Sequence, residues 1–151
     1  QQLIAESLGK NGMGFLPVVS NVPKDHHSLL QLFLDGPRDK IFYVFNYEKT
    51  TSKKIKIKSN DKKLSHLNNK NIEAIKSAQT KALVETLKNN KISYRIFELK
   101  NINEETLGEL FSYFMLETVI IGNLVGINPF GQPAVEQVKV LTKKYLFESA
   151  K

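Results

Sequence analysis

A carboxylate and an amide lie near the start of the chain at a spacing that a helix would bring together. Gln2 and Glu6 are four residues apart, so on a helix both side chains share one face, just before the chain turns at residues 7–9. This is a polar pair at the end of a helix. The same spacing is also typical of an ordinary exposed helix face, so this pair alone does not identify a site.

A second polar stripe lies near the end of the chain. Gln132, Glu136 and Lys139 follow i, i+4 and i+7 spacing, which lines them up along one side of a helix. Val135, Val138 and Leu141 occupy another side. A lysine on a polar stripe beside a carboxylate is ordinarily a helix ion pair worth a few tenths of a kcal/mol.

Two adjacent histidines provide the third chemical feature. His26 and His27 point about 100° apart on a helix, so they are poorly placed to bind one metal ion together. If Asp25 caps this helix, His27 falls in its first turn, where the helix dipole favours the neutral imidazole. Such a ring can exchange protons near neutral pH, and a solvated surface histidine is the alternative.

Composition limits the classes of function. The 151 residues are 41% apolar and contain no cysteine, which suits one domain over residues 1–151 and excludes disulfides and thiolate chemistry. No uninterrupted apolar run reaches the roughly 18 residues of a membrane span, so we expect a cytoplasmic protein without a membrane partner. The net charge of +7 would suit an anionic ligand. Nucleic acid is an alternative that would use Lys53 to Lys63, although no aromatic residues interleave with those lysines.

Helices and strands are predicted to alternate along the chain. A strand of alternating lysine and isoleucine over residues 54–58, with one face in solvent, is one element of this pattern. We expect the residue 104–121 helix to be deeply buried, because it is apolar almost all round. This order predicts a three-layer α/β/α sandwich with a mainly parallel sheet and a ligand site at the carboxyl ends of the strands. The remaining elements are helices at residues 3–8, 25–34, 71–90 and 133–148, and strands at residues 14–19, 41–45 and 92–99.

Three motifs in this order resemble the phosphoglucose isomerase family. The most specific is residues 122–139, GNLVGINPFGQPAVEQVK, in which Gln132, Val135, Glu136 and Lys139 match the C-terminal signature of that family. The other two are QQLIAESLGK at residues 1–10 and His-Ser at residues 27–28. Three positions depart from the family pattern. Gly131 stands where the family has Asp or Asn, Ala134 where it has Gly, and Leu8 where it often has Asn.

This resemblance implies a sugar isomerase (SIS) fold and an aldose–ketose isomerase that interconverts glucose 6-phosphate and fructose 6-phosphate. Glu6 would move a proton between C2 and C1 through a cis-enediol. His27 and Lys139 would transfer protons during ring opening, and Gln2 and Gln132 would hold the sugar phosphate. Neither a cofactor nor a metal ion is implied.

The resemblance also implies a C-terminal domain from a longer, two-domain protein. The expected partners are the sugar phosphate, the N-terminal SIS domain and a second subunit, because sites in this family are shared across a homodimer. We therefore expect the isolated domain to be nearly inactive. The alternative is a non-catalytic SIS module that senses sugar phosphates, although such a module would not need the enediol base.

Overall fold

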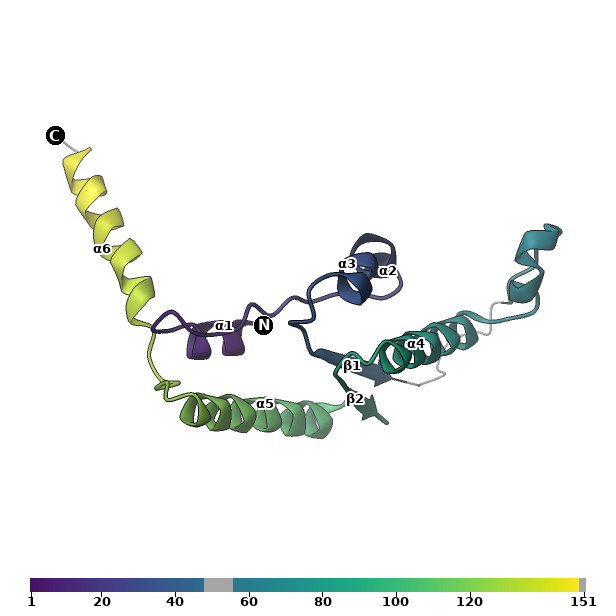
Figure 1. Ribbon diagram of the computed structural model, residues 1–151. Coiled ribbons are helices and arrows are strands. Elements are labelled where there is room, and N and C mark those ends of the chain that lie inside the picture. Colours follow the sequence, from purple (N-terminus) through teal and green to yellow (C-terminus); the bar gives the residue numbers. More distant parts are fainter. Residues whose placement is uncertain (48–55, 150–151) are drawn as a thin grey trace. The chain divides into compact units, whose positions relative to one another are not determined.

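The computed structural model describes residues 1–47 and 56–149, and these fall into two compact units. Unit 1 joins Gln1–Val19 to the described residues from Leu107 onward, and unit 2 is Ser20–Thr106. Figure 1 shows the elements in chain order. Each unit is described separately below, and a single domain over residues 1–151 stays a prediction.

Unit 2 contains a parallel pair of strands, β1 (Phe42–Tyr47) and β2 (Tyr94–Leu99). Their register runs from Phe42 opposite Tyr94 to Tyr47 opposite Leu99. The long helix α4 (Ile72–Asn89) lies between them in the chain, as a parallel crossover requires. The α/β class and the parallel pairing are therefore confirmed, and both strands and this helix lie within two residues of their predicted bounds.

Local capping explains where α4 begins and ends. The Asn71 side chain accepts a hydrogen bond from the backbone N–H of Ala74 (2.8 Å) and so caps the first turn. At the other end Lys91 has φ 55°, and Ile92 N–H donates to the carbonyl of Leu87 (2.9 Å). Leu87 and Ile92 are both buried, so the helix ends with the paired apolar residues of a Schellman motif.

Two predictions in unit 2 are wrong in detail. The expected helix over residues 25–34 is divided at Leu29 into α2 (Lys24–Ser28) and α3 (Leu30–Asp35). Asp25 lies within α2 instead of capping it, because its carboxylate accepts the backbone N–H of Asn21 (2.6 Å) from outside the helix. His27 is consequently in the last turn of a five-residue helix, where the dipole argument for a neutral ring does not apply.

The second wrong prediction in unit 2 is the lysine–isoleucine strand over residues 54–58. Residues 54 and 55 lie outside the described residues. Lys56 makes one isolated antiparallel bridge to Asn71, and residues 57 and 58 belong to no strand. Residues 62–67 form instead a short 3₁₀ helix, η1 (Lys62–Leu67), whose first turn is capped by the Asp61 carboxylate.

Unit 1 is helical and carries both polar stripes. Its helices are α1 (Gln2–Leu8), most of α5 (Glu104–Leu124) and α6 (Pro133–Glu148), and α6 matches the predicted range. The predicted strand over residues 14–19 is not formed: these residues have no regular structure, and Leu16 is 86% exposed. A strand needs a hydrogen-bonding neighbour, and the sheet of the described chain contains β1 and β2 alone.

The burial predicted for α5 is also wrong. Phe111 is 66% exposed and Leu116 is 64% exposed, so much of the apolar surface of this helix is uncovered within this chain. By length and composition α5 could also cross a membrane, a test that core helices of soluble proteins pass as well. It carries four carboxylates, Glu104, Glu105, Glu109 and Glu117.

Candidate active site in unit 1

Helix α1 holds the carboxylate of Glu6 beside the amide of Gln2. Gln2 Nε2 donates to Glu6 Oε1 (3.0 Å), as the four-residue spacing predicts. The helix ends at Leu8, which is fully buried, so the packing of Leu8 fixes the end of α1 next to Glu6. Glu6 itself lies on the exposed side of the helix.

A turn before α6 brings Gln132 to the same carboxylate. Gln132 Nε2 donates to Glu6 Oε2 (3.2 Å) across 126 positions of sequence. An ionised carboxylate can only accept hydrogen bonds, so both glutamines must present their NH₂ groups to it. The contact therefore fixes the orientation of both amides. Each carboxylate oxygen takes one amide donor and keeps one lone pair for another group.

The C-terminal end of α5 determines the path of the chain into this turn. Gly126 has φ 70°, and Ile127 N–H folds back to donate to the carbonyl of Gly122 (2.8 Å). Ile127 is buried at 3% exposure. The side chain of Asn128 then accepts the backbone N–H of Phe130 (3.0 Å), an Asx turn that orders the approach to Gln132.

Lys10 joins this turn to the segment that follows α1. Its Nζ donates to the carbonyl oxygens of Asn128 (2.7 Å) and Phe130 (3.1 Å). Its own backbone lies in a turn, in which Met13 N–H donates to the carbonyl of Lys10 (2.9 Å). Three hydrogen bonds thus connect residues 6–10 with residues 128–132, two from Lys10 and one from Gln132.

Helix α6 carries the other predicted pair. Lys139 Nζ contacts Glu136 Oε1 at 2.5 Å, so the ammonium and the carboxylate are already paired one turn into the helix. Both side chains are more than half exposed. Gln132 is the N-cap residue and Pro133 the first residue of α6, which explains why Gln132 turns away from the helix toward Glu6.

His27 lies in the other unit. His27 is exposed on α2. The adjacent His26 is half-buried, and the Nε2 atom of His26 has no hydrogen-bond partner among the described residues. The four remaining predicted site residues, Gln2, Glu6, Gln132 and Lys139, all belong to unit 1. In the described part of the chain, no group of three histidine or acidic side chains is close enough to hold a metal ion.

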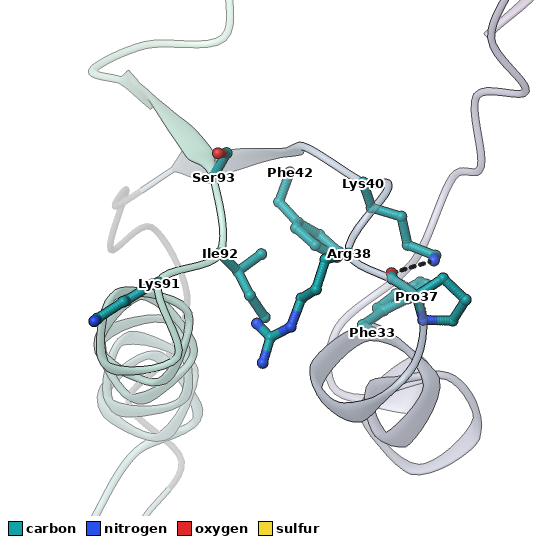
Figure 2. Close-up of a pocket in the computed structure, with 8 residues that line it drawn as sticks. All are labelled: Phe33, Pro37, Arg38, Lys40, Phe42, Lys91, Ile92 and Ser93. Atoms are coloured by element: carbon teal, nitrogen blue, oxygen red, sulfur yellow. Dashed lines mark hydrogen bonds between the residues drawn. The ribbon is translucent and has the colours of Figure 1, made fainter.

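Unit 2 has a separate small pocket at the amino ends of the two strands. Figure 2 shows it between α3, the start of β1 and the end of α4, with Phe33, Phe42 and Ile92 among its lining side chains. Arg38 donates to the carbonyl of Asn90 (2.8 Å) and Lys40 to that of Pro37 (3.0 Å). Arg38 therefore satisfies the C-cap carbonyl of α4, and Lys40 is also paired with the Asp39 carboxylate. The pocket contains none of the predicted site residues.

Sequence reasoning finds the residues of the unit 1 site but misses what holds them together. In the sequence Lys10 is only the last position of the first motif, and Asn128 is only part of a turn. Neither its spacing nor its local pattern indicates that Lys10 contacts residues more than a hundred positions away. The sequence links Lys10 to the site only because Lys10 belongs to the same motif as Glu6.

The curated proteins that the chain resembles are named glucose-6-phosphate isomerases. The chain is 39% identical over 141 residues to a glucose-6-phosphate isomerase of Methanocaldococcus jannaschii, which covers 92% of the chain and 34% of that protein. It is 34% identical over 150 residues to the glucose-6-phosphate isomerase of Campylobacter jejuni, covering 96% of the chain and 37% of that protein. The chain thus spans about a third of the curated relatives that it matches. No family model matches the sequence.

A solved structure resembles the chain over nearly its whole length. It is a hypothetical protein of Thermus thermophilus, with a TM-score of 0.83 and 31% sequence identity. The similarity covers 96% of this chain and 36% of that one. Both kinds of comparison therefore relate this chain to one part of a larger protein.

Proposed function

Because the chain belongs to the glucose-6-phosphate isomerase family, we propose that it is the C-terminal SIS domain of an enzyme that interconverts glucose 6-phosphate and fructose 6-phosphate. The observation that carries the proposal is the Glu6 carboxylate, which accepts one amide donor from Gln2 and one from Gln132. Two segments far apart in sequence converge on one carboxylate. This is the arrangement that a positioned general base needs.

In the proposed reaction Glu6 removes the proton from C2 of the open-chain sugar and returns it to C1. The free lone pair on each carboxylate oxygen gives the base a direction in which to accept that proton. Removal of the C2 proton with protonation of O1 gives the cis-enediol, which stays in the site. Protonation of C1 with loss of the O2 proton then gives the ketose. The amides of Gln2 and Gln132 keep Glu6 aimed and also bind the sugar phosphate.

Lys139 and His27 complete the proposed chemistry by transferring protons during ring opening. The Glu136 carboxylate orients the Lys139 ammonium at 2.5 Å. We infer that His27 enters a neighbouring subunit's site, so the active protein is a homodimer. The route uses neither a cofactor nor a metal ion.

The exposure of Glu6 indicates what must surround it in the complete enzyme. Glu6 is exposed within this chain, whereas a base that removes a carbon-bound proton works best away from water. We infer that the N-terminal SIS domain supplies this cover and the rest of the phosphate site, so the chain alone is nearly inactive. The working protein is cytoplasmic, with no membrane or nucleic-acid partner.

The test is isomerase activity on fructose 6-phosphate in the full-length protein. We expect Glu6→Gln to lose several orders of magnitude in kcat, because an amide cannot accept the proton. His27→Ala and Lys139→Ala should lose less, since ring opening also occurs without help. Gln31→Ala, an exposed residue of α3, is the matched control and should keep full activity.

Two outcomes would contradict the proposal. Full activity in Glu6→Gln would move the base elsewhere. Absence of turnover in the folded wild type, together with sugar-phosphate binding, would instead favour the sensor module.

A further inference from the structure

We propose that Lys10 is a positioning residue for Glu6 and Gln132, acting as a clamp between the segment after α1 and the turn before α6. The inference rests on the proposed function for its kinetic test. Lys10 does not contact either side chain. It donates instead to two backbone carbonyls, those of Asn128 (2.7 Å) and Phe130 (3.1 Å).

The geometry explains why an ammonium suits this place. A lysine Nζ carries three N–H groups and can donate to two carbonyls that face it from one turn. The Asx turn at Asn128 orders this stretch of backbone, and Gly131, at φ 72°, follows directly. Lys10 is half-buried as a residue, and both of its hydrogen bonds lie at the exposed surface of unit 1. A charged donor makes a stronger hydrogen bond than a neutral one, so an ammonium holds these two carbonyls better than a neutral donor would.

The clamp lies immediately beside the reacting groups in sequence. Lys10 is four residues after Glu6, and Phe130 is two residues before Gln132. The bonds from Lys10 therefore fix the two backbones whose side chains meet at the Glu6 carboxylate. Of the three hydrogen bonds that connect the two segments, only the 3.2 Å bond from Gln132 to Glu6 would remain without Lys10.

Misplacing a catalytic group by about 1 Å can lower the rate by roughly 100-fold. We therefore expect Lys10→Met in the full-length enzyme to lower kcat by about 10- to 100-fold, with a smaller change in KM. Lys10→Arg should recover most of this loss, because a guanidinium also presents several donors. Lys81→Met, which removes an exposed lysine from α4, is the matched control and should leave kcat unchanged.

A double-mutant cycle separates positioning from a general loss of stability. If Lys10 acts through Gln132, Lys10→Met should add little to the loss already caused by Gln132→Ala, so the two effects will not multiply. Multiplication of the two losses would overturn the proposal. So would unchanged kcat in Lys10→Met.

Hydrogen exchange tests the clamp independently of activity. In the full-length protein, Lys10→Met should speed exchange of the Phe130 amide, which is hydrogen-bonded in this turn, and of the Val135 amide in the first turn of α6, and should leave α4 unchanged. Uniform acceleration, or none, would overturn the proposal. If the wild type has no isomerase activity, the proposed function fails, and this exchange experiment still decides the role of Lys10.

Discussion

Gln132 reaches Glu6 from the other end of the chain, and its effect can be tested by changing what it donates. Gln132→Ala removes one hydrogen bond to a charged group, an interaction worth about 1.5–3 kcal/mol. We expect kcat/KM to fall by roughly 10- to 100-fold. Gln132→Glu should be worse than Gln132→Ala, because a second carboxylate cannot donate and repels Glu6. Steady-state kinetics of both variants checks the order, and equal losses would contradict it.

Residue spacing predicts some of these contacts and cannot predict others. The pairing of Gln2 with Glu6 follows from helix geometry, and so does that of Glu136 with Lys139. The contact of Gln132 with Glu6 depends on how two distant segments pack, and local periodicity carries no information about that. Only the resemblance to a family placed those two residues in one site.

At the scale of elements, two glycines of α5 provide a matched test of the turn that leads to Gln132. A Cβ on Gly122 would come within 3.1 Å of the Ile127 carbonyl oxygen and 3.2 Å of Pro129 Cβ. The backbone of Ile127 is itself bonded to Gly122 and cannot easily move away. A Cβ on Gly108 would meet nothing within 4 Å.

We therefore expect opposite effects of the same substitution. Gly122→Ala should destabilise the full-length protein by about 1–3 kcal/mol through crowding. Gly108→Ala should stabilise it by about 0.5–1 kcal/mol, because alanine is the better helix former. Denaturant unfolding of both variants measures the difference, and a stabilised Gly122→Ala would refute the crowding.

The cap of α4 gives a second test at this scale. Asn71→Ala removes the acceptor for the Ala74 N–H and should lower the free energy of unfolding by about 1 kcal/mol. Asn71→Asp keeps an acceptor at the same place and should retain most of that stability. Thermal or denaturant unfolding of both variants measures the loss of stability. Identical losses in the two variants would show that the capping hydrogen bond does not cause the loss.

Elements with strong local signals are predicted well, and those that depend on neighbours are not. Helices α4 and α6 have clear caps or an initial proline, and both are found almost as expected. The segment of residues 14–19 has the apolar composition of a strand, but an apolar run does not specify a partner. The prediction of a buried α5 fails for the same reason. An apolar composition shows that a helix has surface to bury, but it does not show which part of the protein covers that surface.

At the scale of the whole molecule, unit 1 exposes many apolar side chains that no other part of the described chain covers. Along α6, Val138 is 67% exposed, Leu146 65% and Phe147 77%. An excess of exposed apolar side chains on one helix favours a surface that another body covers. This agrees with relatives about three times as long as the chain.

We expect the chain alone to show almost no isomerase activity, and co-expression with the remaining two thirds of the enzyme to restore it. The exposed apolar surface would drive the two pieces together. The measurement is turnover of fructose 6-phosphate in a host that lacks its own isomerase, with Glu6→Gln in the co-expressed chain as the control. Robust turnover by the chain alone would contradict this expectation.

Unit 1 is built from the two ends of the chain, with the whole of unit 2 between them. During synthesis, therefore, Glu6 and Lys10 leave the ribosome long before Asn128 and Gln132 exist. At about 5–20 residues per second, the first half of the site waits on the order of 10 seconds for the second. The Glu6 carboxylate therefore gains its second amide, from Gln132, only after the whole of unit 2 has been synthesised.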